Sequence, residues 1–203
     1  MCSADFSRYP KCNVLAVALA LASGAYSLPV AAQTYAPWLK QIGLTNTIAS
    51  AANWGNGQLL GVVDTGINVT HPQFTAGQVS QLSSGCAAVS FRCSNGVSDD
   101  NGHGTAVASI AAGNRVSQFA TVSGGGYTTT MGNFISVAPS ANIVAQKVLN
   151  AAGSGYSTDV ANGIRKAADA GVGVINVSIT YGNDANTVAA INYAAAKGAF
   201  IVW

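Results

Sequence analysis

Short runs of apolar residues alternate along the chain with longer stretches in which the apolar residues recur at helical spacing. The runs are rich in Val, Ile and Leu, which is typical of buried strands, and the periodic stretches are typical of helices packed on one side. One of these helices is expected at 156–170, with Ser157 or Thr158 as its N-cap. The pattern predicts strands at 58–63, 142–149, 173–179 and 199–203, helices at 36–52, 103–112, 156–170 and 184–197, and a surface loop over 71–101.

Strands that alternate with helices indicate a parallel sheet whose two faces are both covered by helices. We therefore predict an α/β fold with three layers, α/β/α, a mostly parallel sheet and right-handed crossovers. In such sheets the chemistry lies beyond the carboxyl ends of the strands. Asp64 follows the first strand, residues 150–155 follow the second and residues 180–183 follow the third.

The first 32 residues have the layout of a secretory signal peptide. Two basic residues precede an apolar run, Val14 to Ala22, which is too short to span a bilayer. Small residues fit a cleavage after Ala32, and a second possible cleavage site follows Ala25. A buried core helix is the competing interpretation of the apolar run. We expect residues 1–32 to be removed and the chain to be exported, to the periplasm, the cell surface or the medium.

The composition narrows the class of partner. Of the 203 residues only 8% are charged, the net charge is +2, and all seven acidic residues are Asp. Without a basic cluster the chain has no electrostatic footprint for nucleic acid. The low charge and 49% hydrophobic residues argue against disorder. The length fits one domain with a short appendage, and no segment after the expected signal peptide is apolar enough for a membrane helix.

Two of the four cysteines, Cys86 and Cys93, remain once the expected signal peptide is removed. An even number of cysteines in an exported chain favours a disulfide between them. Two free buried thiols are the alternative. Neither cysteine belongs to a C-x-x-C pair, so the spacing does not match a zinc pattern. We expect no metal site and no cofactor.

His103 is the candidate for acid–base chemistry. It lies between two glycines, which leave the imidazole uncrowded. An imidazole titrates near neutrality and can take and return a proton, provided that an acceptor orients its other nitrogen. Asp64, 39 residues earlier at a strand end, can supply that acceptor from a rigid position. The other histidine, His71, precedes a proline and is interpreted as a turn residue.

Five stretches of the chain carry motifs in a fixed order. They are Val62–Ile67 with His71-Pro72, Asn101–Thr105 with the small residues up to Ala112, Val137–Pro139 with Ala141 and Lys147–Leu149, Gly153–Ser157, and Asn162–Ile164 with Val174–Ile179. In this order they resemble the motifs of the subtilisin-like serine proteases (subtilases), the first stretch the Asp motif and the second the His motif. The signal peptide, the Asn- and Gly-rich loops and the long segment near 114–136 are further similar to the subtilases of bacterial autotransporters.

The resemblance implies a serine-type endopeptidase with a subtilisin-like fold and a triad in the order Asp, His, Ser. Asp64 would orient and support His103, which would act first as general base and then as general acid. The family allows structural calcium, but no motif in this chain supports it. Two strand segments would bind a peptide or protein substrate in extended conformation by backbone hydrogen bonds: Gly153, Ser154 and Gly155, and Ser178, Ile179 and Thr180.

One part of the family pattern has no counterpart in the chain. The family's nucleophile lies in a Gly-Thr-Ser motif, and its oxyanion-hole Asn follows the strand that begins here at Ala199. Neither occurs in the 203 residues, and Ser109, Ser154 and Ser178 do not match the pattern. We therefore expect the chain to be the N-terminal part of a subtilase, with a partial peptidase domain over 33–203, and to be inactive in this form.

Three other interpretations stay open. In the first, the chain is a non-catalytic fragment that binds peptides through the same strand segments. In the second, it is a nucleotide-binding α/β domain that uses Gly153-Ser154-Gly155, although Thr158 stands where the dinucleotide fingerprint needs its third glycine. In the third, Asp99, Asp100 and His103 together bind a metal, although the glycines around His103 fit the protease motif better.

Overall fold

The computed structural model describes residues 39, 41–44, 53–80, 83, 96–114, 136–180 and 184–203. The chain divides into two compact units, residues 1–33 and 34–203, and every described residue belongs to the second. The expected signal peptide, most of the helix expected at 36–52, and the cysteines Cys86 and Cys93 lie outside the described residues. No helix in the described part is long and apolar enough to cross a membrane.

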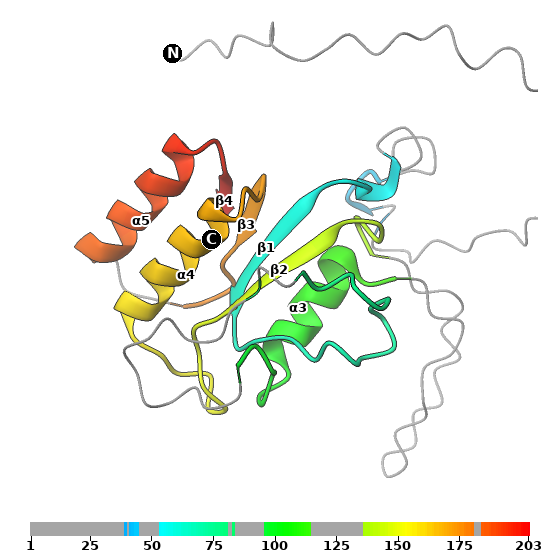
Figure 1. Cartoon of the computed structure of the whole chain (residues 1–203), viewed down its shortest axis with the longest axis horizontal. Coiled ribbons are helices and arrows are strands. Elements are labelled where there is room, and N and C mark those ends of the chain that lie inside the picture. The colour runs from blue at the N-terminus through cyan, green and yellow to red at the C-terminus, as the bar shows by residue number, and fades with distance from the viewer. Residues whose placement is uncertain are drawn as a thin grey trace, which may run out of the picture. The chain divides into compact units, whose positions relative to one another are not determined.

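Four parallel strands form one sheet in the described residues, in the order β2-β1-β3-β4 (Figure 1). The strands are β1 (Leu59–Asp64), β2 (Asn142–Lys147), β3 (Val174–Asn176) and β4 (Phe200–Val202). All three pairings are parallel, as the sequence pattern predicts. Because Asp64 is the register partner of Lys147, β1 and β2 end at the same edge of the sheet.

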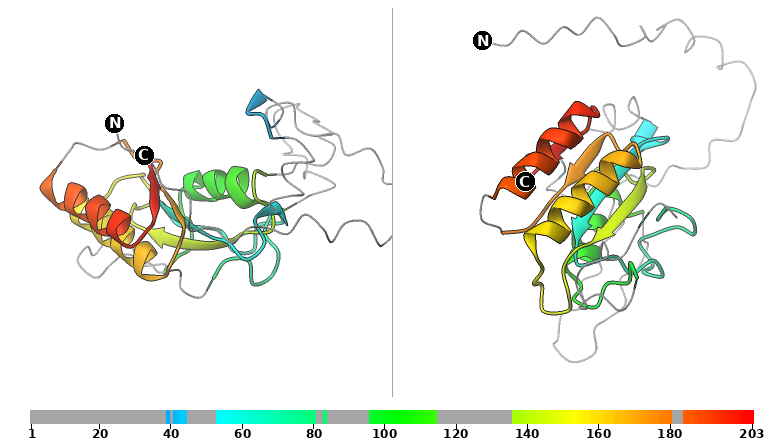
Figure 2. Two further views of the ribbon diagram at one scale, coloured as in Figure 1. Left: turned by 90° about the horizontal axis from the view of Figure 1, so that it is seen from above. Right: turned by 60° about the vertical axis from the view of Figure 1, so that its left-hand side comes forward.

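Helices cover the sheet from both sides. They are α3 (His103–Ala112), α4 (Ser157–Asp169) and α5 (Ala185–Ala196), and a short 3₁₀ turn, η1 (Asn53–Gly55), precedes β1. Successive side chains of a strand point to opposite faces. Val62 packs in the core with α3, whereas Val63 packs in the core with α4 and α5. The two cores lie on opposite faces, which gives the three predicted layers; α4 and α5 lie side by side (Figures 1 and 2).

Four details differ from the sequence-based expectation. The helix expected at 36–52 is interrupted at residues 42–44, because Gly43 has a φ of +76° and the N–H of Leu44 donates to the carbonyl oxygen of Leu39, as at a helix end. β3 is confined to Val174–Asn176, because β4, its neighbour on one side, pairs with it only at those three residues. β2 ends at Lys147, two residues earlier than predicted. The N-cap of α4 is Tyr156, without a side-chain cap bond, because Ser157 already has helical backbone angles.

One face of the sheet is only half covered in the described structure. α3 contacts β1 and β2 but not β3 or β4. The alternate side chains of the uncovered strands are therefore exposed on that face: Val174 by 39%, Phe200 by 68% and Val202 by 45%. Their neighbours Ile175 and Ile201 point the other way and pack with α4 and α5.

Candidate active site

Asp64, the last residue of β1, is completely buried. Val62 faces α3, and alternation along the strand turns the Asp64 side chain to the same face. The backbone N–H of Thr65 donates a hydrogen bond to Oδ1 of Asp64 over 2.6 Å. The end of the strand thus fixes the orientation of this carboxylate.

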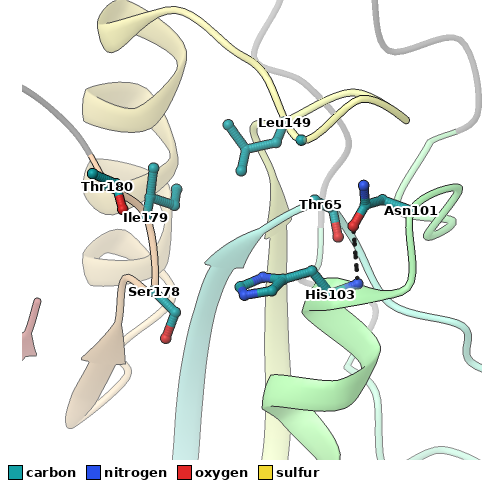
Figure 3. Close-up of a pocket in the computed structure, with 8 residues that line it drawn as sticks. Thr65, Asn101, His103, Leu149, Ser178, Ile179 and Thr180 are labelled. Atoms are coloured by element: carbon teal, nitrogen blue, oxygen red, sulfur yellow. Dashed lines mark hydrogen bonds between the residues drawn. The ribbon is translucent and has the colours of Figure 1, made fainter.

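His103 begins α3 directly opposite this carboxylate. Its Nδ1 lies 2.8 Å from Oδ1 and 3.0 Å from Oδ2 of Asp64. An ionised carboxylate can only accept hydrogen bonds, so Nδ1 carries the proton and Nε2 has the free lone pair. The His103 side chain is half exposed, and its ring projects into a cavity (Figure 3). The structure thus contains the hydrogen bond that the sequence predicts, with Nε2 ready to accept a proton.

Glycines allow the two elements to approach this closely. A Cβ on Gly104 would lie 2.2 Å from the carbonyl oxygen of Gly66 and 3.2 Å from Oδ1 of Asp64. Gly66 has a φ of +110°, and a Cβ there would lie 2.5 Å from the carbonyl oxygen of Val97. Side chains at either position would push α3 and its loop away from the end of β1.

Asp99 accepts five hydrogen bonds in the loop before α3. Its Oδ1 accepts from the Thr65 hydroxyl at 2.8 Å and from the N–H groups of Asn101 and Gly102 at 3.1 and 2.9 Å. Its Oδ2 accepts from the N–H and the hydroxyl of Thr105 at 2.9 and 2.5 Å. Burial raises the pKa of Asp99, but these hydrogen bonds together outweigh burial and lower the pKa from 3.8 to about 2.

Thr65 connects this carboxylate to the pair. Its hydroxyl donates to Asp99 and accepts a hydrogen bond from the N–H of Gly104 at 2.9 Å. Its own N–H donates to Asp64. One residue after β1 therefore contacts both the buried carboxylate and the first turn of α3.

A buried cation lies behind the site. Lys147, at the end of β2, is fully buried, and its Nζ donates to the carbonyl oxygen of Thr65 at 2.5 Å and to Oδ1 of Asp100 at 2.6 Å. The exposed fraction of the Asp100 side chain is 26%. Lys147 thus joins the end of β1 to the loop that leads into α3.

The cavity beside His103 has a volume of about 270 Å³. Four of the six predicted substrate-binding residues line it, and Ser154 and Gly155 do not. A Cβ on Gly155 would lie 2.3 Å from the carbonyl oxygen of Val148, so this glycine permits close chain packing. The lining residues are Thr65, Asn101, His103, Leu149, Gly153, Ser178, Ile179 and Thr180 (Figure 3).

Neither predicted substrate-binding segment is a β-strand in the structure. Gly153 has a φ of +71° and lies in a turn in which Oδ1 of Asn150 accepts from the N–H of Ser154. Residues 178–180 continue from β3 without a strand partner in the described residues. The first segment is therefore a turn and not the expected strand, because Asn150 and the positive φ of Gly153 favour a turn there. Pairing of residues 178–180 with a peptide stays a prediction.

Sequence reasoning missed three lining residues, Thr65, Asn101 and Leu149. Asn101 holds two loops together: its Nδ2 donates to the carbonyl oxygen of Ala151 at 2.9 Å, and its Oδ1 accepts from the N–H of His103 at 3.2 Å. In the motifs Thr65 directly follows Asp64 and Asn101 lies two residues before His103, which is the signal that could have found them.

The open metal interpretation finds no support in this geometry. Asp99 is held by Thr65 and the start of α3, Asp100 by Lys147, and His103 by Asp64. Among the described residues no three His, Cys, Asp or Glu side chains gather as a metal site would need.

None of the described serines is hydrogen-bonded to His103. Ser178 lines the same cavity as His103, but its hydroxyl accepts a hydrogen bond from Nδ2 of Asn176 at 2.8 Å. The Ser109 hydroxyl donates to the carbonyl oxygen of Ala106 within α3. Within the described residues, no hydrogen bond joins a serine to Nε2 of His103.

Comparison with known proteins gives the same family from sequence and from structure. The model of the subtilase family matches residues 55–203. The solved structure of a protein named Sphericase is 35% identical, with a TM-score of 0.56 over 72% of this chain. A cold-adapted subtilisin-like serine proteinase is 29% identical, with a TM-score of 0.51 over 72% of this chain. The chain spans 45% of the length of each of these two proteins.

Proposed function

The chain belongs to the subtilase family, and on that basis we propose that it is the Asp- and His-bearing part of a serine-type endopeptidase of peptides and proteins. The observation that carries the proposal is the pair formed by Asp64 and His103 at the edge of a cavity. A buried carboxylate on one ring nitrogen and an open cavity on the other is the arrangement that nucleophilic serine catalysis requires.

In the proposed reaction, Nε2 of His103 takes the proton of a serine hydroxyl as that oxygen attacks the peptide carbonyl carbon. The resulting imidazolium is stabilised by the Asp64 carboxylate, which itself stays ionised. His103 then gives the proton to the leaving amine, and an acyl-enzyme remains. Water repeats the sequence: His103 takes its proton, the hydroxide attacks the ester, and the serine oxygen regains a proton as the acid leaves.

The cavity supports an extended peptide as substrate. Gly153 and the Ser178–Thr180 segment both line it, coming from the ends of two different strands. Each segment lies beyond the carboxyl end of its strand, where ligands bind in open α/β sheets. A peptide lying between them would meet backbone groups on both sides, the mode of recognition in which main-chain hydrogen bonds provide affinity.

We further propose that these 203 residues do not cleave peptides by themselves. Nε2 of His103 can accept a proton only from a nucleophile beside it, and no described serine hydroxyl is hydrogen-bonded to His103. In subtilisin, loss of the triad serine alone reduces turnover about 2 × 10⁶-fold. The catalytic part is therefore proposed to require a Ser-bearing segment of the family.

The test joins this chain to the C-terminal, Ser-bearing part of a subtilase and assays casein cleavage. The extended protein should cleave casein, and His103→Ala and Asp64→Asn should each reduce the rate at least a thousandfold. His71→Ala is the matched control, because within the described residues His71 has no hydrogen bond to a carboxylate and lies outside the cavity lining. Equal activity of the His103→Ala variant and the parent would refute the proposal.

A second candidate function is peptide binding without cleavage. Two observations favour it: the cavity beside His103, and the lack of a hydrogen bond between His103 and any described serine. The unextended chain should then bind an extended peptide in a fluorescence titration while leaving it intact. Ser178→Ala should leave the peptide uncleaved as well. Casein cleavage by the unextended chain that Ser178→Ala abolishes would replace this proposal with one in which Ser178 is the nucleophile.

We also propose that the chain is exported, as in the subtilases of bacterial autotransporters, after cleavage behind Ala32. Mass spectrometry of exported protein should find Gln33 at the N-terminus and a Cys86–Cys93 disulfide. That bridge would close a loop of eight residues and contribute about 2.5 kcal/mol through loop entropy. Two thiols that react with an alkylating agent without reductant would exclude the bridge.

A further inference from the structure

Asp99 is hydrogen-bonded neither to Asp64 nor to His103, yet it is hydrogen-bonded to the groups that hold both. On the strand side its Oδ1 accepts a hydrogen bond from the hydroxyl of Thr65 at 2.8 Å. On the helix side it accepts from the N–H and hydroxyl of Thr105, in the first turn of α3. Its carboxylate therefore lies between the end of β1 and the start of α3, the two elements that supply the pair.

We propose that Asp99 is a positioning residue of the active site: through Thr65 and the first turn of α3, it holds His103 against Asp64. The inference rests on the proposed function, since it concerns the same pair. The first link runs from Asp99 to the Thr65 hydroxyl, and from the Thr65 N–H to the Asp64 carboxylate. The second runs from Asp99 through the backbone of α3, which His103 begins.

A simple helix cap would not need the first link. Asp184 provides the comparison within the same chain: its carboxylate accepts from the N–H groups of Asn186 and Thr187 and from the Thr187 hydroxyl, all in α5. Asp99 makes the corresponding bonds to α3 and in addition binds the residue after β1. The bond from Asp99 to Thr65 joins two elements, which capping of α3 alone would not require.

The charge of Asp99 is also part of the argument. In all five of its hydrogen bonds the carboxylate is the acceptor, and both of its oxygens are used. An Asn of the same size has one acceptor oxygen and an NH₂ group that would face other donors. Burial raises the pKa of Asp99, but the N–H groups of Gly102 and Thr105 and the hydroxyls of Thr105 and Thr65 together lower it to about 2, so these donors favour the charged form. Asp99→Asn should therefore release Thr65 and the start of α3 together.

The test measures the hydrogen bond itself. In the full chain labelled with ¹⁵N-histidine, the Nδ1–H of His103 is held by a carboxylate and should give a slowly exchanging proton signal in NMR spectra. Only two histidines need assigning, and Nδ1 of His71 accepts from the N–H of Gln73, so its ring has no competing Nδ1–H. Asp64→Asn should abolish the His103 signal and so identify it.

Asp99→Asn should make the His103 Nδ1–H exchange at least tenfold faster or lose its signal. Asp184→Asn, the matched control, should leave the exchange unchanged although it weakens a helix cap of the same kind. Far-UV circular dichroism of each variant at the same temperature establishes that it is folded. A folded Asp99→Asn protein with the exchange rate of the parent would overturn the proposal.

A second pair of variants decides the matter if Asp99→Asn does not fold. Thr65→Ser keeps the hydroxyl and should keep the slow exchange, whereas Thr65→Val leaves the bonds of Asp99 to α3 in place but should speed exchange several-fold. Equal exchange in these two variants would also overturn the proposal. A signal that depends on Asp99, in a chain whose extended form cleaves no casein, would instead refute the proposed function and leave the positioning role standing.

Discussion

The carbonyl oxygen of Gly66 occupies the space in which a side chain on Gly104 would begin, since a Cβ there would lie 2.2 Å from it. Gly66 follows the strand that carries Asp64, and Gly104 follows His103 in α3. The hydrogen bond between the carboxylate and the imidazole thus depends on two backbones packed without a side chain between them. The glycine after the histidine is a packing requirement of the pair.

Gly104→Ala should therefore separate His103 from Asp64. Because the clash is with backbone and not with a flexible side chain, α3 must shift, and we expect a loss of about 1–3 kcal/mol in the free energy of unfolding. The His103 Nδ1–H signal should disappear with it. Gly173→Ala is the control, because a Cβ there meets nothing within 4 Å. Urea unfolding measures both; equal midpoints for the two variants would contradict the explanation.

Much of the fold follows from local pattern. α3 has the predicted bounds, His103–Ala112, since glycines stand at both of its ends. The parallel order of the strands follows from apolar strands that alternate with helices. The end of β3 could not be predicted, because it depends on where a neighbouring strand stops pairing. The cap of α4 differs from the prediction because a serine near a helix start can stand one position inside the helix.

The site is predictable only in part. Asp64 and His103 carry chemistry that the sequence displays, and the geometry brings them together. Leu149 enters the cavity through the turn after β2, which no local pattern specifies. Asp99 resembles a metal ligand in the sequence, because a carboxylate near a histidine has that appearance. Only the structure gives its partners, which are Thr65, 34 residues earlier at the end of β1, and Thr105 in α3.

Asp99 should make the protein sensitive to acid. Burial raises its pKa, but the hydrogen bonds to it lower the folded-state pKa from 3.8 to about 2. A depressed folded pKa means that the unfolded chain binds more protons between these values, so this stability is present above pH 4 and is lost as the pH falls toward 2. After allowance for solvent screening it amounts to roughly 1–2 kcal/mol.

Asp99→Asn should remove this contribution. Parent and variant, unfolded in urea, should differ in free energy at pH 7, and the difference should shrink as the pH falls from 4 to 2. Asp184→Asn serves as the control for loss of a helix-capping carboxylate. A difference that stays constant from pH 7 to pH 2 would mean that Asp99 does not contribute through its charge.

The face of β3 and β4 that no helix covers in the described part of the chain should govern the solubility of the protein. Phe200 and Val202 are exposed there on an edge strand, and exposed apolar strands favour association. Phe200→Lys should raise the concentration at which the chain remains monomeric in light scattering, with little effect on unfolding. Ile175→Ala, on the buried face, should cost about 2–5 kcal/mol without that gain. Unchanged association of Phe200→Lys would exclude this face as its cause.

Lys147 should stabilise the site only as one member of a pair. Its ammonium group is fully buried and contacts Asp100 and the Thr65 carbonyl, so Lys147→Met leaves both without their donor. We expect a loss of about 2–4 kcal/mol, at or below the range for breaking a buried pair because Asp100 is partly exposed. Asp100→Asn should also destabilise the protein, since it leaves the buried cation without its counter-charge.

In a double-mutant cycle of Lys147→Met and Asp100→Asn, the two losses of free energy should be less than additive, by at least about 1 kcal/mol, because the second substitution removes a charge that the first has already left unpaired. Strict additivity would mean that Lys147 acts through the Thr65 carbonyl and not through Asp100.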